Sequence, residues 1–572
     1  MRPRIRVAVV LAVAAAALVA AATAGAHAWI VRTAPVANRT LDSPPREVRL
    51  AYSEPVEARF AIVSVTDAAG KLVTPGAPHR AATNPKQVVV PLKRLDQGWY
   101  LVFWRVISAD GHPVRGAFTF AAGPSPGPAP EFAVPSLSET ATTPRLLVTR
   151  WVVFLSLMSA LGLFALRCGI ARPLRTSSLR AVTVAFAIAL AVALLSTPLY
   201  VLFATAQFSL RGVSDLGGIV PLARASAFGR DYLDLELVLG LFAISALAAI
   251  WLDRPERRER SVAAILALVA AAATGAAALL IPPLAGHAGQ KSPRGLALTV
   301  DWLHLAAASV WIGGLIGLVV LWIVAGSKTR VETLRVVVPR FSRVAFVSVV
   351  ALVGTGVGSS LLELPTLASL WDTSYGHTLI VKIVLLAGAL VLAALNLART
   401  KPRLERAGAE PSLGPGAALL LRRLVQGEIV LAVGALFAAG VLASLAPPSP
   451  ALAKAGKAAA KVGPGPVSRT VNESGYALRF RINPNRAAAS NTFVVEIERA
   501  GRPVRGADVL ERLEMLDMAM GSQTVRLEER APGRYEHESA ALVMAGHWGM
   551  TFEITPPGRK PFTVVLRDRA TG

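Results

Sequence analysis

The residues with the greatest potential for chemistry are an aspartate and a histidine two positions apart, Asp110 and His112. Side chains two residues apart on an extended segment project to the same side. His27 adds an imidazole and, if the processed chain begins there, a free amine. An amine, two imidazoles and a carboxylate in a flat arrangement suit Cu(II), the strongest binder among the common divalent ions. The alternative is that Asp110 and His112 only close a turn.

The availability of the His27 amine depends on how the N-terminal segment is processed. Residues 1–26 have the pattern of a secretory signal peptide, with a basic start, an apolar stretch from Val7 to Ala22 and the small-residue site Ala24-Gly25-Ala26. Cleavage after that site would make His27 the N-terminal residue. A second small-residue site, Ala26-His27-Ala28, fits the same pattern and would remove His27 from the mature chain.

Three more histidines are candidate metal ligands in the apolar middle of the chain: His287, His304 and His377. All three fall on the exported side in the topology argued below, and His304 lies about six residues, or roughly 9 Å, inside a predicted span. Ionisable groups at membrane depth are costly and often mark transport pathways. Asp301 shares a helix face with His304 and could orient its imidazole. The alternative is an imidazole that hydrogen-bonds to a neighbour.

Methionine is concentrated near the end of the chain. Five of the seven methionines fall there: Met515, Met518, Met520, Met544 and Met550. His547 lies three residues from each of the last two. Thioethers are soft ligands that favour Cu(I), and an imidazole adds a nitrogen donor. The alternative is that these side chains fill irregular gaps in a core.

The composition places the middle of the chain in a membrane. Of the 572 residues, 53% are hydrophobic and 17% charged, and the apolar excess lies between about Arg145 and Ala446. The apolar runs in this region are roughly 20 residues long, which is the length that a helix needs to cross a hydrocarbon core of about 30 Å. Much of the net charge of +24 sits in short loops between these runs, which argues against nucleic-acid binding. The single cysteine, Cys168, excludes an internal disulfide and a Cys-based metal cluster.

The sequence predicts eight membrane spans, near residues 146–168, 181–206, 232–252, 261–282, 298–325, 341–362, 378–398 and 422–446. If the N-terminal segment is exported, the four inside segments hold nineteen Lys and Arg residues and the three outside loops hold five. This asymmetry follows the positive-inside rule and returns the C-terminal segment to the outside. The predicted location is therefore the cytoplasmic membrane, with both terminal domains on the periplasmic or extracellular side.

The predicted fold is multidomain: an all-β sandwich or barrel, an eight-helix transmembrane bundle and a second all-β domain. Short alternating strands separated by turns, such as 47–52 and 99–104, predict the first β-domain. Similar alternation at 476–482 predicts the second. The predicted order is a signal peptide 1–26, a β-domain 27–122, a linker 123–144, a membrane domain 145–446, a linker 447–468 and a β-domain 469–572.

The first β-domain resembles the CopC family of periplasmic copper-binding proteins. The resemblance rests on Ala34-Pro35 near its start and on the motif Asp110-Gly111-His112-Pro113-Val114 near its end. It implies a Cu(II) site formed by the amine and imidazole of His27 with Asp110 and His112. Some members of the family carry a Met-rich Cu(I) site, whereas this chain has no methionine between Met1 and Met158. We therefore expect Cu(II) alone in this domain.

The middle segment resembles the CopD family of membrane copper-resistance proteins. The motifs that carry this resemblance are Asp301-Trp302-Leu303-His304, Trp311-Ile312-Gly313-Gly314-Leu315 and Tyr375-Gly376-His377, with Lys382, Asn396 and Glu428. It implies copper handling or passage across the membrane with a CopC partner. By topology, Lys382 and Glu428 lie toward opposite membrane faces and are not expected to pair. The C-terminal segment resembles the YtkA-like domain through Met518-Ala519-Met520-Gly521 and Met544-Ala545-Gly546-His547-Trp548.

The predicted function is copper binding on the exported side and copper import across the cytoplasmic membrane, in copper homeostasis and resistance. The expected partners are copper ions, the bilayer and periplasmic copper chaperones, and no enzymatic activity is expected. No Walker motif is present, so the chain itself is not an ATP-driven pump. The alternatives are a haem-bearing membrane oxidoreductase, an oxidative enzyme that uses an N-terminal histidine copper site, and a copper donor for oxidase assembly.

Overall fold

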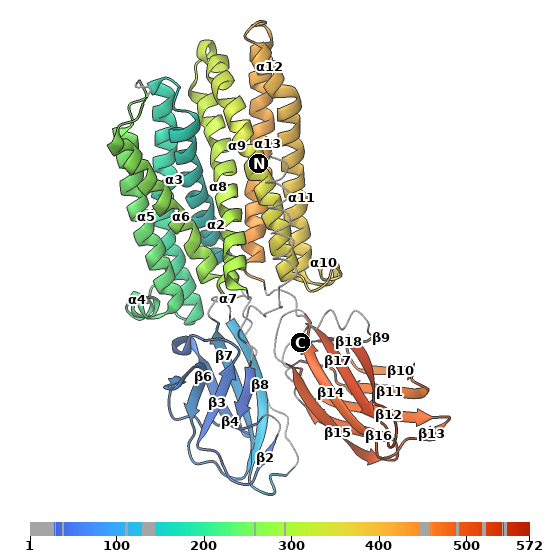
Figure 1. Cartoon of the computed structure of the whole chain (residues 1–572). Coiled ribbons are helices and arrows are strands. Elements are labelled where there is room, and N and C mark those ends of the chain that lie inside the picture. The colour runs from blue at the N-terminus through green and yellow to red at the C-terminus, as the bar shows by residue number, and fades with distance from the viewer. Residues whose placement is uncertain are drawn as a thin grey trace. The chain divides into compact units, whose positions relative to one another are not determined.

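The chain folds into two β-domains and a bundle of long helices that precedes the second of them (Figure 1). The computed structural model describes residues 28, 30–36, 39–108, 113–127, 143–256, 259–290, 293–445, 458, 460–487, 491–516, 522–539, 541–542 and 546–571. These three parts confirm the predicted fold class.

The N-terminal β-domain consists of two sheets of four strands each, in which most neighbouring strands are antiparallel. One sheet has the order β1-β3-β6-β5 and the other β2-β8-β7-β4. The strands are β1 (Ile30–Ala34), β2 (Thr40–Leu41), β3 (Glu47–Tyr52), β4 (Ile62–Asp67), β5 (His79–Ala81), β6 (Asn84–Pro91), β7 (Gly98–Ile107) and β8 (Pro113–Ala122), and a 3-10 turn, η1 (Ala58–Phe60), follows β3. Alternate residues of β3, such as Leu50, are buried because successive side chains of a strand face opposite ways.

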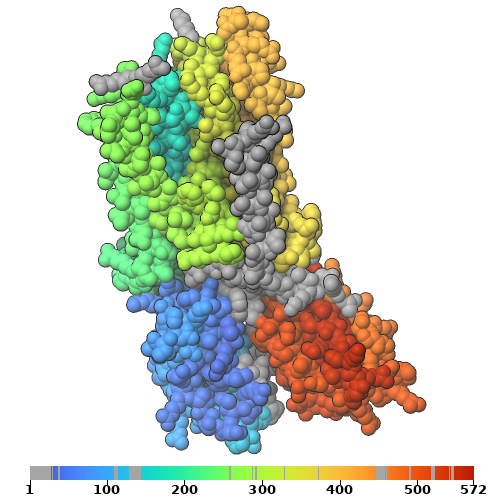
Figure 2. Space-filling model, viewed as in Figure 1, coloured from blue at the N-terminus to red at the C-terminus, as the bar shows by residue number. Residues whose placement is uncertain are grey.

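Eight long helices in the described part of the chain form the bundle, as the sequence predicted. Figure 2 shows one face of their packed side chains. They are α2 (Pro144–Ala165), α3 (Thr176–Phe208), α5 (Ala227–Leu252), α6 (Val262–Ala285), α8 (Arg294–Val324), α9 (Ser327–Glu363), α11 (Ser374–Leu395) and α13 (Leu413–Leu442). Shorter elements are η2 (Leu166–Ile170), α4 (Leu216–Ala225), α7 (His287–Gln290), α10 (Ser369–Asp372), η3 (Asn396–Thr400) and α12 (Lys401–Arg406). Each long helix is apolar enough to cross a bilayer, so the chain is a multi-pass membrane protein.

Helices α2 and α8 pack together at the centre of the bundle because glycines allow their backbones to approach. A Cβ atom added to Gly162 on α2 would lie 1.9 Å from the carbonyl oxygen of Ser309 on α8. A Cβ atom on Gly313 would lie 2.5 Å from the Cα atom of Gly162. Small residues at such crossings are typical of membrane helices, whose association depends on close packing.

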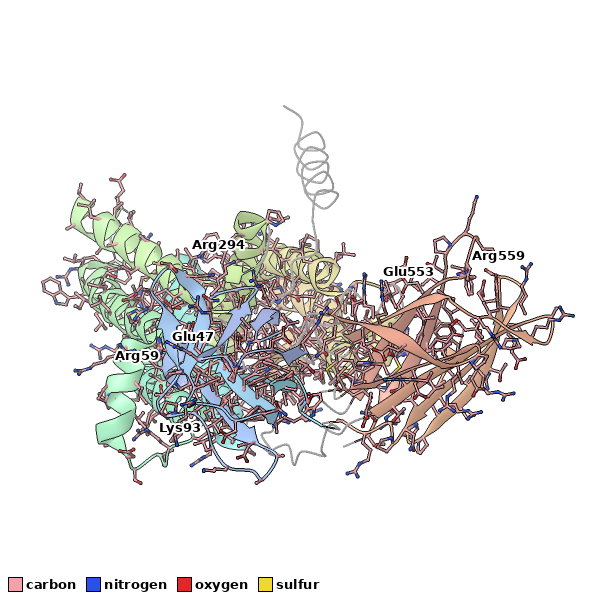
Figure 3. The ribbon with its side chains drawn as sticks, turned by 90° about the horizontal axis from the view of Figure 1, so that it is seen from below. Glu47, Arg59, Lys93, Arg294, Glu553 and Arg559 are labelled. Carbon is pink, nitrogen blue, oxygen red and sulfur yellow. The ribbon has the colours of Figure 1, made fainter. Side chains whose placement is uncertain are left out.

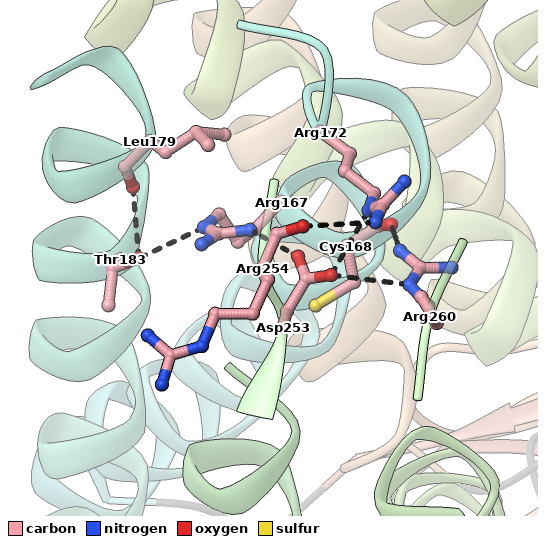
Figure 4. Close-up of polar contacts among 8 residues, drawn as sticks. All are labelled: Arg167, Cys168, Arg172, Leu179, Thr183, Asp253, Arg254 and Arg260. Atoms are coloured by element: carbon pink, nitrogen blue, oxygen red, sulfur yellow. Dashed lines mark hydrogen bonds and ion pairs between the residues drawn. The ribbon is translucent and has the colours of Figure 1, made fainter. Parts of the chain in front are cut away.

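A buried carboxylate ties together the ends of four helices on the predicted inner side (Figure 4). Asp253, directly after α5, accepts hydrogen bonds from Arg167 at 3.3 Å, Arg172 at 3.0 Å and Arg260 at 3.4 Å. Burial alone would raise the pKa of Asp253, but the hydrogen bonds from Arg172 and Arg167 hold it below its ordinary value. The predicted inside arginines therefore have a structural role here as well as a topological one.

The C-terminal β-domain is built from one continuous path of strands, β10-β11-β12-β16-β15-β14-β17-β18-β9. Their bounds are β9 (Ala460–Lys461), β10 (Val467–Glu473), β11 (Tyr476–Asn483), β12 (Asn491–Arg499), β13 (Arg502–Pro503), β14 (Asp508–Met515), β15 (Gln523–Ala531), β16 (Arg534–Ser539), β17 (Gly546–Thr555) and β18 (Phe562–Ala570). Charged side chains of both β-domains lie at the surface, including Arg59, Lys93, Glu553 and Arg559 (Figure 3).

Candidate metal-binding sites

The predicted Cu(II) ligands of the first β-domain, His27, Asp110 and His112, lie outside the described residues. The positions of their neighbours are nevertheless defined. Strands β7 and β8 form a hairpin whose last pair is Ile107 with Pro113, so the Asp-x-His motif connects these two strands.

The start of β1 and the last pair of the β7–β8 hairpin lie toward the same end of the domain. Ile30 at the start of β1 pairs with Tyr52 at the end of β3. Four residues later, Val56 forms a bridge with Ser108, the residue after β7. The register of the flanking strands therefore fits a site assembled from the N-terminal residues and the β7–β8 connection.

Two carboxylates that the sequence reasoning missed lie at the same end. Glu54 and Glu57 precede and follow Val56 and are buried, and the backbone N–H of Glu57 donates to the carbonyl of Ile107. No periodic pattern of residues marks them, because they fall between strands rather than on one.

In the bundle, His304 on α8 makes a defined contact with α9. Its Nδ1 atom lies 3.0 Å from the hydroxyl oxygen of Thr355. That hydroxyl lies 2.7 Å from the carbonyl oxygen of Ala351 and 3.1 Å from that of Leu352, and it donates its own proton to this turn. The Thr355 oxygen can then only accept from His304, so Nδ1 carries the imidazole proton. The Nε2 lone pair is left available for a metal ion.

Other polar groups accompany His304 in the half of α8, α9 and α11 that is predicted to be the outer one. Ser359 donates to Asp301 at 3.1 Å, and Lys382 is close enough to interact electrostatically with both Asp301 and His304. Tyr375 interacts similarly with Asp301 and with Glu363. We call the set Asp301, His304, Thr355, Ser359, Glu363, Tyr375 and Lys382 the outer polar cluster.

A sequence signal for part of this cluster existed. Thr355, Ser359 and Glu363 follow one another at intervals of four, which places them on one face of an otherwise apolar helix. The sequence reasoning followed histidines instead, because hydroxyl side chains in membrane helices often bond only to their own backbone.

The other two predicted membrane ligands are placed differently. His287 begins the short helix α7, and His377 is the fourth residue of α11 with an exposed side chain. Among the side chains that the structure describes, no three of His, Cys, Asp and Glu converge as a set able to hold a metal ion.

The predicted methionine site of the C-terminal domain divides into two groups. Met515 on β14 and Met550 on β17 are buried in the core, as expected of side chains that fill gaps. His547 is half-buried near the start of β17. Met518, Met520 and Met544 lie outside the described residues.

Comparison with known proteins finds a family match within each of the three parts of the chain. Residues 30–123 match the CopC domain, residues 335–442 match Copper resistance protein D and residues 470–553 match the YtkA-like family. The chain belongs to the CopC–CopD family. Its N-terminal domain is 34% identical over 109 residues to Copper resistance protein C of Xanthomonas campestris pv. juglandis, covering 18% of this chain and 84% of that protein.

A relative of the same overall length is the Copper transport protein CutJ of Bacillus subtilis (strain 168), 27% identical over 542 residues and 92% of each chain. Protein YobA of Escherichia coli (strain K12) is 34% identical over 96 residues, which are 17% of this CopC–CopD protein and 77% of YobA. Among solved structures, CopC from Methylosinus trichosporium OB3b is 30% identical, with a TM-score of 0.17 and coverage of 18% of this chain and 99% of that one.

Proposed function

We propose that this protein binds copper on the exported side of the cytoplasmic membrane and transports it into the cytoplasm, in copper homeostasis and resistance. The match to the CopC and CopD families and the likeness to a named copper transport protein over 92% of the chain support this function. The excess of basic residues in the predicted inside loops supports an orientation with both β-domains outside.

Copper is first captured as Cu(II) by His27, Asp110 and His112. This ligand set is supported by the strand register, which brings the start of β1 and the last pair of the β7–β8 hairpin to one end of the domain. A mature N-terminus at His27 would supply a chelate of amine and imidazole nitrogens, which suits Cu(II).

The observation that carries the membrane step is the contact of the His304 Nδ1 atom with a Thr355 hydroxyl that donates to its own helix. This contact favours the proton on Nδ1, which leaves Nε2 with a lone pair within the outer half of the bundle. Metal-binding histidines commonly use one ring nitrogen as ligand while the other donates to an oxygen that orients the ring. We assign His304 as the copper ligand of the outer polar cluster and Thr355 as its positioning residue.

In the C-terminal domain, a Cu(I) site would be formed by Met518, Met520 and Met544 with His547. Soft thioethers favour Cu(I). Met515 and Met550 would support this site from the core rather than bind copper directly, because both are buried.

The membrane step is tested with full-length variants in cells by measuring copper accumulation. His304→Ala should abolish the protein-dependent uptake. Thr355→Val should lower it about fivefold, the equivalent of a hydrogen bond worth about 1 kcal/mol, and Thr355→Ser should restore it. Thr274→Val is a matched control: Thr274 makes the same backbone contacts at 2.8 and 3.2 Å, and its side-chain neighbour is Ser245. Wild-type uptake by His304→Ala would refute the assignment.

The capture step is tested by the mature N-terminus. The full chain processed to His27 should bind one Cu(II) tightly, and one additional residue before His27 should weaken that binding strongly because the amine is displaced. Equal affinity of the two forms would exclude a ligand set that includes the His27 amine.

A further inference from the structure

A second polar site lies deep in the bundle, separate from the outer polar cluster. Glu428 is the sixteenth of the 30 residues of α13 and is only 2% exposed. The side-chain amide nitrogen of Asn396, on η3, donates to its Oε1 atom. Asn396 lies 14 residues beyond Lys382 along the same helix, or about 21 Å at helical rise, so this pair is remote from His304.

The site contains oxygen atoms that have no partner. The amide oxygen of Asn396 and the hydroxyl oxygen of Thr400 are buried without a hydrogen bond within the described part of the chain. Thr400 itself is fully buried and lies one turn from Asn396 on η3, which packs against α13. Buried polar atoms normally find partners, so two unpaired oxygens on the segment that contacts a buried carboxylate indicate a missing ligand.

The backbone here is also unusual. Residues Asn396–Thr400 form a π-helical segment between α11 and α12. Such segments are rare, and they occur frequently at functional sites. Of the two π-helical segments described in the bundle, Leu166–Ile170 and Asn396–Thr400, the second carries both unpaired oxygens.

Glu428 has no counter-charge among the described residues. On its own helix the nearest basic residue inward is Arg423, which is exposed, and Arg422 stacks on Trp322 at 4.3 Å. Arg330 from α9 stacks on the same ring at 4.0 Å. The facing parts of α2 (residues 151–165) and α8 (residues 305–324) contain no titratable side chain.

The remaining charged groups on the facing helices are mostly exposed. Exposed are Arg399 on η3, Arg335, Arg340 and Arg343 on α9, and Arg403 and Arg406 on α12, whereas Lys401 at the start of α12 is half-buried. A buried charge without compensation is strongly destabilising, so a cation must accompany Glu428 when its carboxyl group is ionised.

We propose that Glu428, Asn396 and Thr400 form a binding site for a small hard monovalent cation, a proton or Na⁺, whose gradient drives copper transport. The driving role rests on the proposed transport function, whereas the cation site itself does not. The donors are all oxygen atoms, which suit hard cations, while Cu(I) prefers sulfur and nitrogen. Na⁺ would contact the carboxylate, the Asn396 amide oxygen and the Thr400 hydroxyl. A proton would reside on the carboxyl group and be shared with the Asn396 amide.

The first test measures copper accumulation by the full-length protein in phosphatidylcholine vesicles at zero membrane potential. A tenfold gradient of one coupled ion is worth about 1.4 kcal/mol and should shift the steady-state copper ratio about tenfold. One arm applies a pH gradient without Na⁺, and the other applies a Na⁺ gradient at equal pH, so the responding arm identifies the cation. Glu428→Gln should equilibrate copper with a ratio near one in both arms.

Glu236→Gln is the matched control, because Glu236 is also an intramembrane glutamate but lies on α5. It should respond as the wild type does. The driving role is overturned if the copper ratio of the wild type responds to neither gradient. It is also overturned if the copper ratio of Glu428→Gln still responds to one of them. Failure of all copper uptake would count against the proposed function instead.

The second test does not depend on copper. Infrared difference spectra of the full-length protein in the same vesicles should show a carboxyl band that changes with added Na⁺ or with a step from mildly acidic to mildly alkaline pH. The band should be absent from Glu428→Gln and present in Glu236→Gln. If neither change alters a band that depends on Glu428, the cation site is refuted.

Discussion

Replacement of Glu511 by glutamine should stabilise the C-terminal β-domain at neutral pH. Glu511 lies on β14 with its side chain fully buried, and neither carboxyl oxygen has a hydrogen bond within the described residues. Burial, with a smaller contribution from the nearby Asp568 carboxylate, raises the pKa of Glu511 well above its ordinary value of 4.5. The folded domain therefore keeps this carboxyl group protonated at a pH where the unfolded chain ionises it.

The sign and size of the effect follow from this difference. A raised carboxyl pKa means that the folded state binds more protons than the unfolded state, so stability falls as the pH rises above 4.5. The loss between pH 4.5 and 7 has a ceiling of about 3 kcal/mol at 1.36 kcal/mol per unit, reached when the folded domain keeps the carboxyl group neutral over that whole range. Glu511→Gln keeps the shape of the side chain and removes its titration, so its stability advantage should grow from pH 4.5 upward toward that ceiling.

Hydrogen exchange of peptides from β14 and β17, in the full chain in detergent, measures this difference. At neutral pH the variant should exchange more slowly than the wild type, by up to roughly a hundredfold, once the intrinsic rate is corrected. Glu553→Gln, at an exposed glutamate of β17, should match the wild type (Figure 3). Equal protection of wild type and Glu511→Gln at pH 7 would refute the reasoning. Burial also raises the pKa of Asp568 to about 6, so some loss of stability over this range should persist in the variant.

Two further predictions concern the bundle and are checked by thermal unfolding of the full chain in detergent. Asp253→Asn should destabilise the bundle by roughly 3 kcal/mol, because it leaves three arginines around a buried site without their carboxylate; unchanged unfolding would show that the arginines are satisfied elsewhere. Gly162→Ala should prevent normal packing of α2 on α8, since its Cβ atom would lie 1.9 Å from the Ser309 carbonyl oxygen. Gly240→Ala, where a Cβ atom meets nothing within 4 Å, is its control and should unfold like the wild type.

The fold class and the number of spans were predictable because each depends on a strong periodic signal. Apolar runs of membrane length and alternating strands identify elements without any tertiary information. The burial of Glu511 was not predictable in this way. Val509, Glu511, Leu513 and Met515 alternate with Leu510, Arg512 and Glu514, so β14 carries both apolar and charged residues on each face. Only packing against β17 decides which face is inside.

The candidate sites were predictable to the extent that their residue types were unusual for their surroundings. Histidine in an apolar helix and clustered methionine both stood out. Thr355 did not, because its role depends on a neighbour 51 residues away in the sequence. The same holds for Asn396 and Glu428, which are 32 residues apart and meet only when α11 and α13 pack together. The sequence reasoning correctly kept Glu428 apart from Lys382, but it could not supply the partner.

The separation of the two membrane sites limits how copper and a driving cation can be coupled. Between Lys382 and Asn396, α11 has only apolar side chains over about 20 Å, and α13 is equally apolar from Ile429 to Leu442. Neither ion can therefore pass between the sites along these two helices by direct exchange of ligands. If both sites operate in one cycle, they must communicate through movement of the helices that carry them. Helix α11 is the candidate for this movement, since it contributes Lys382 to the outer polar cluster and continues into the π-helical segment that contacts Glu428.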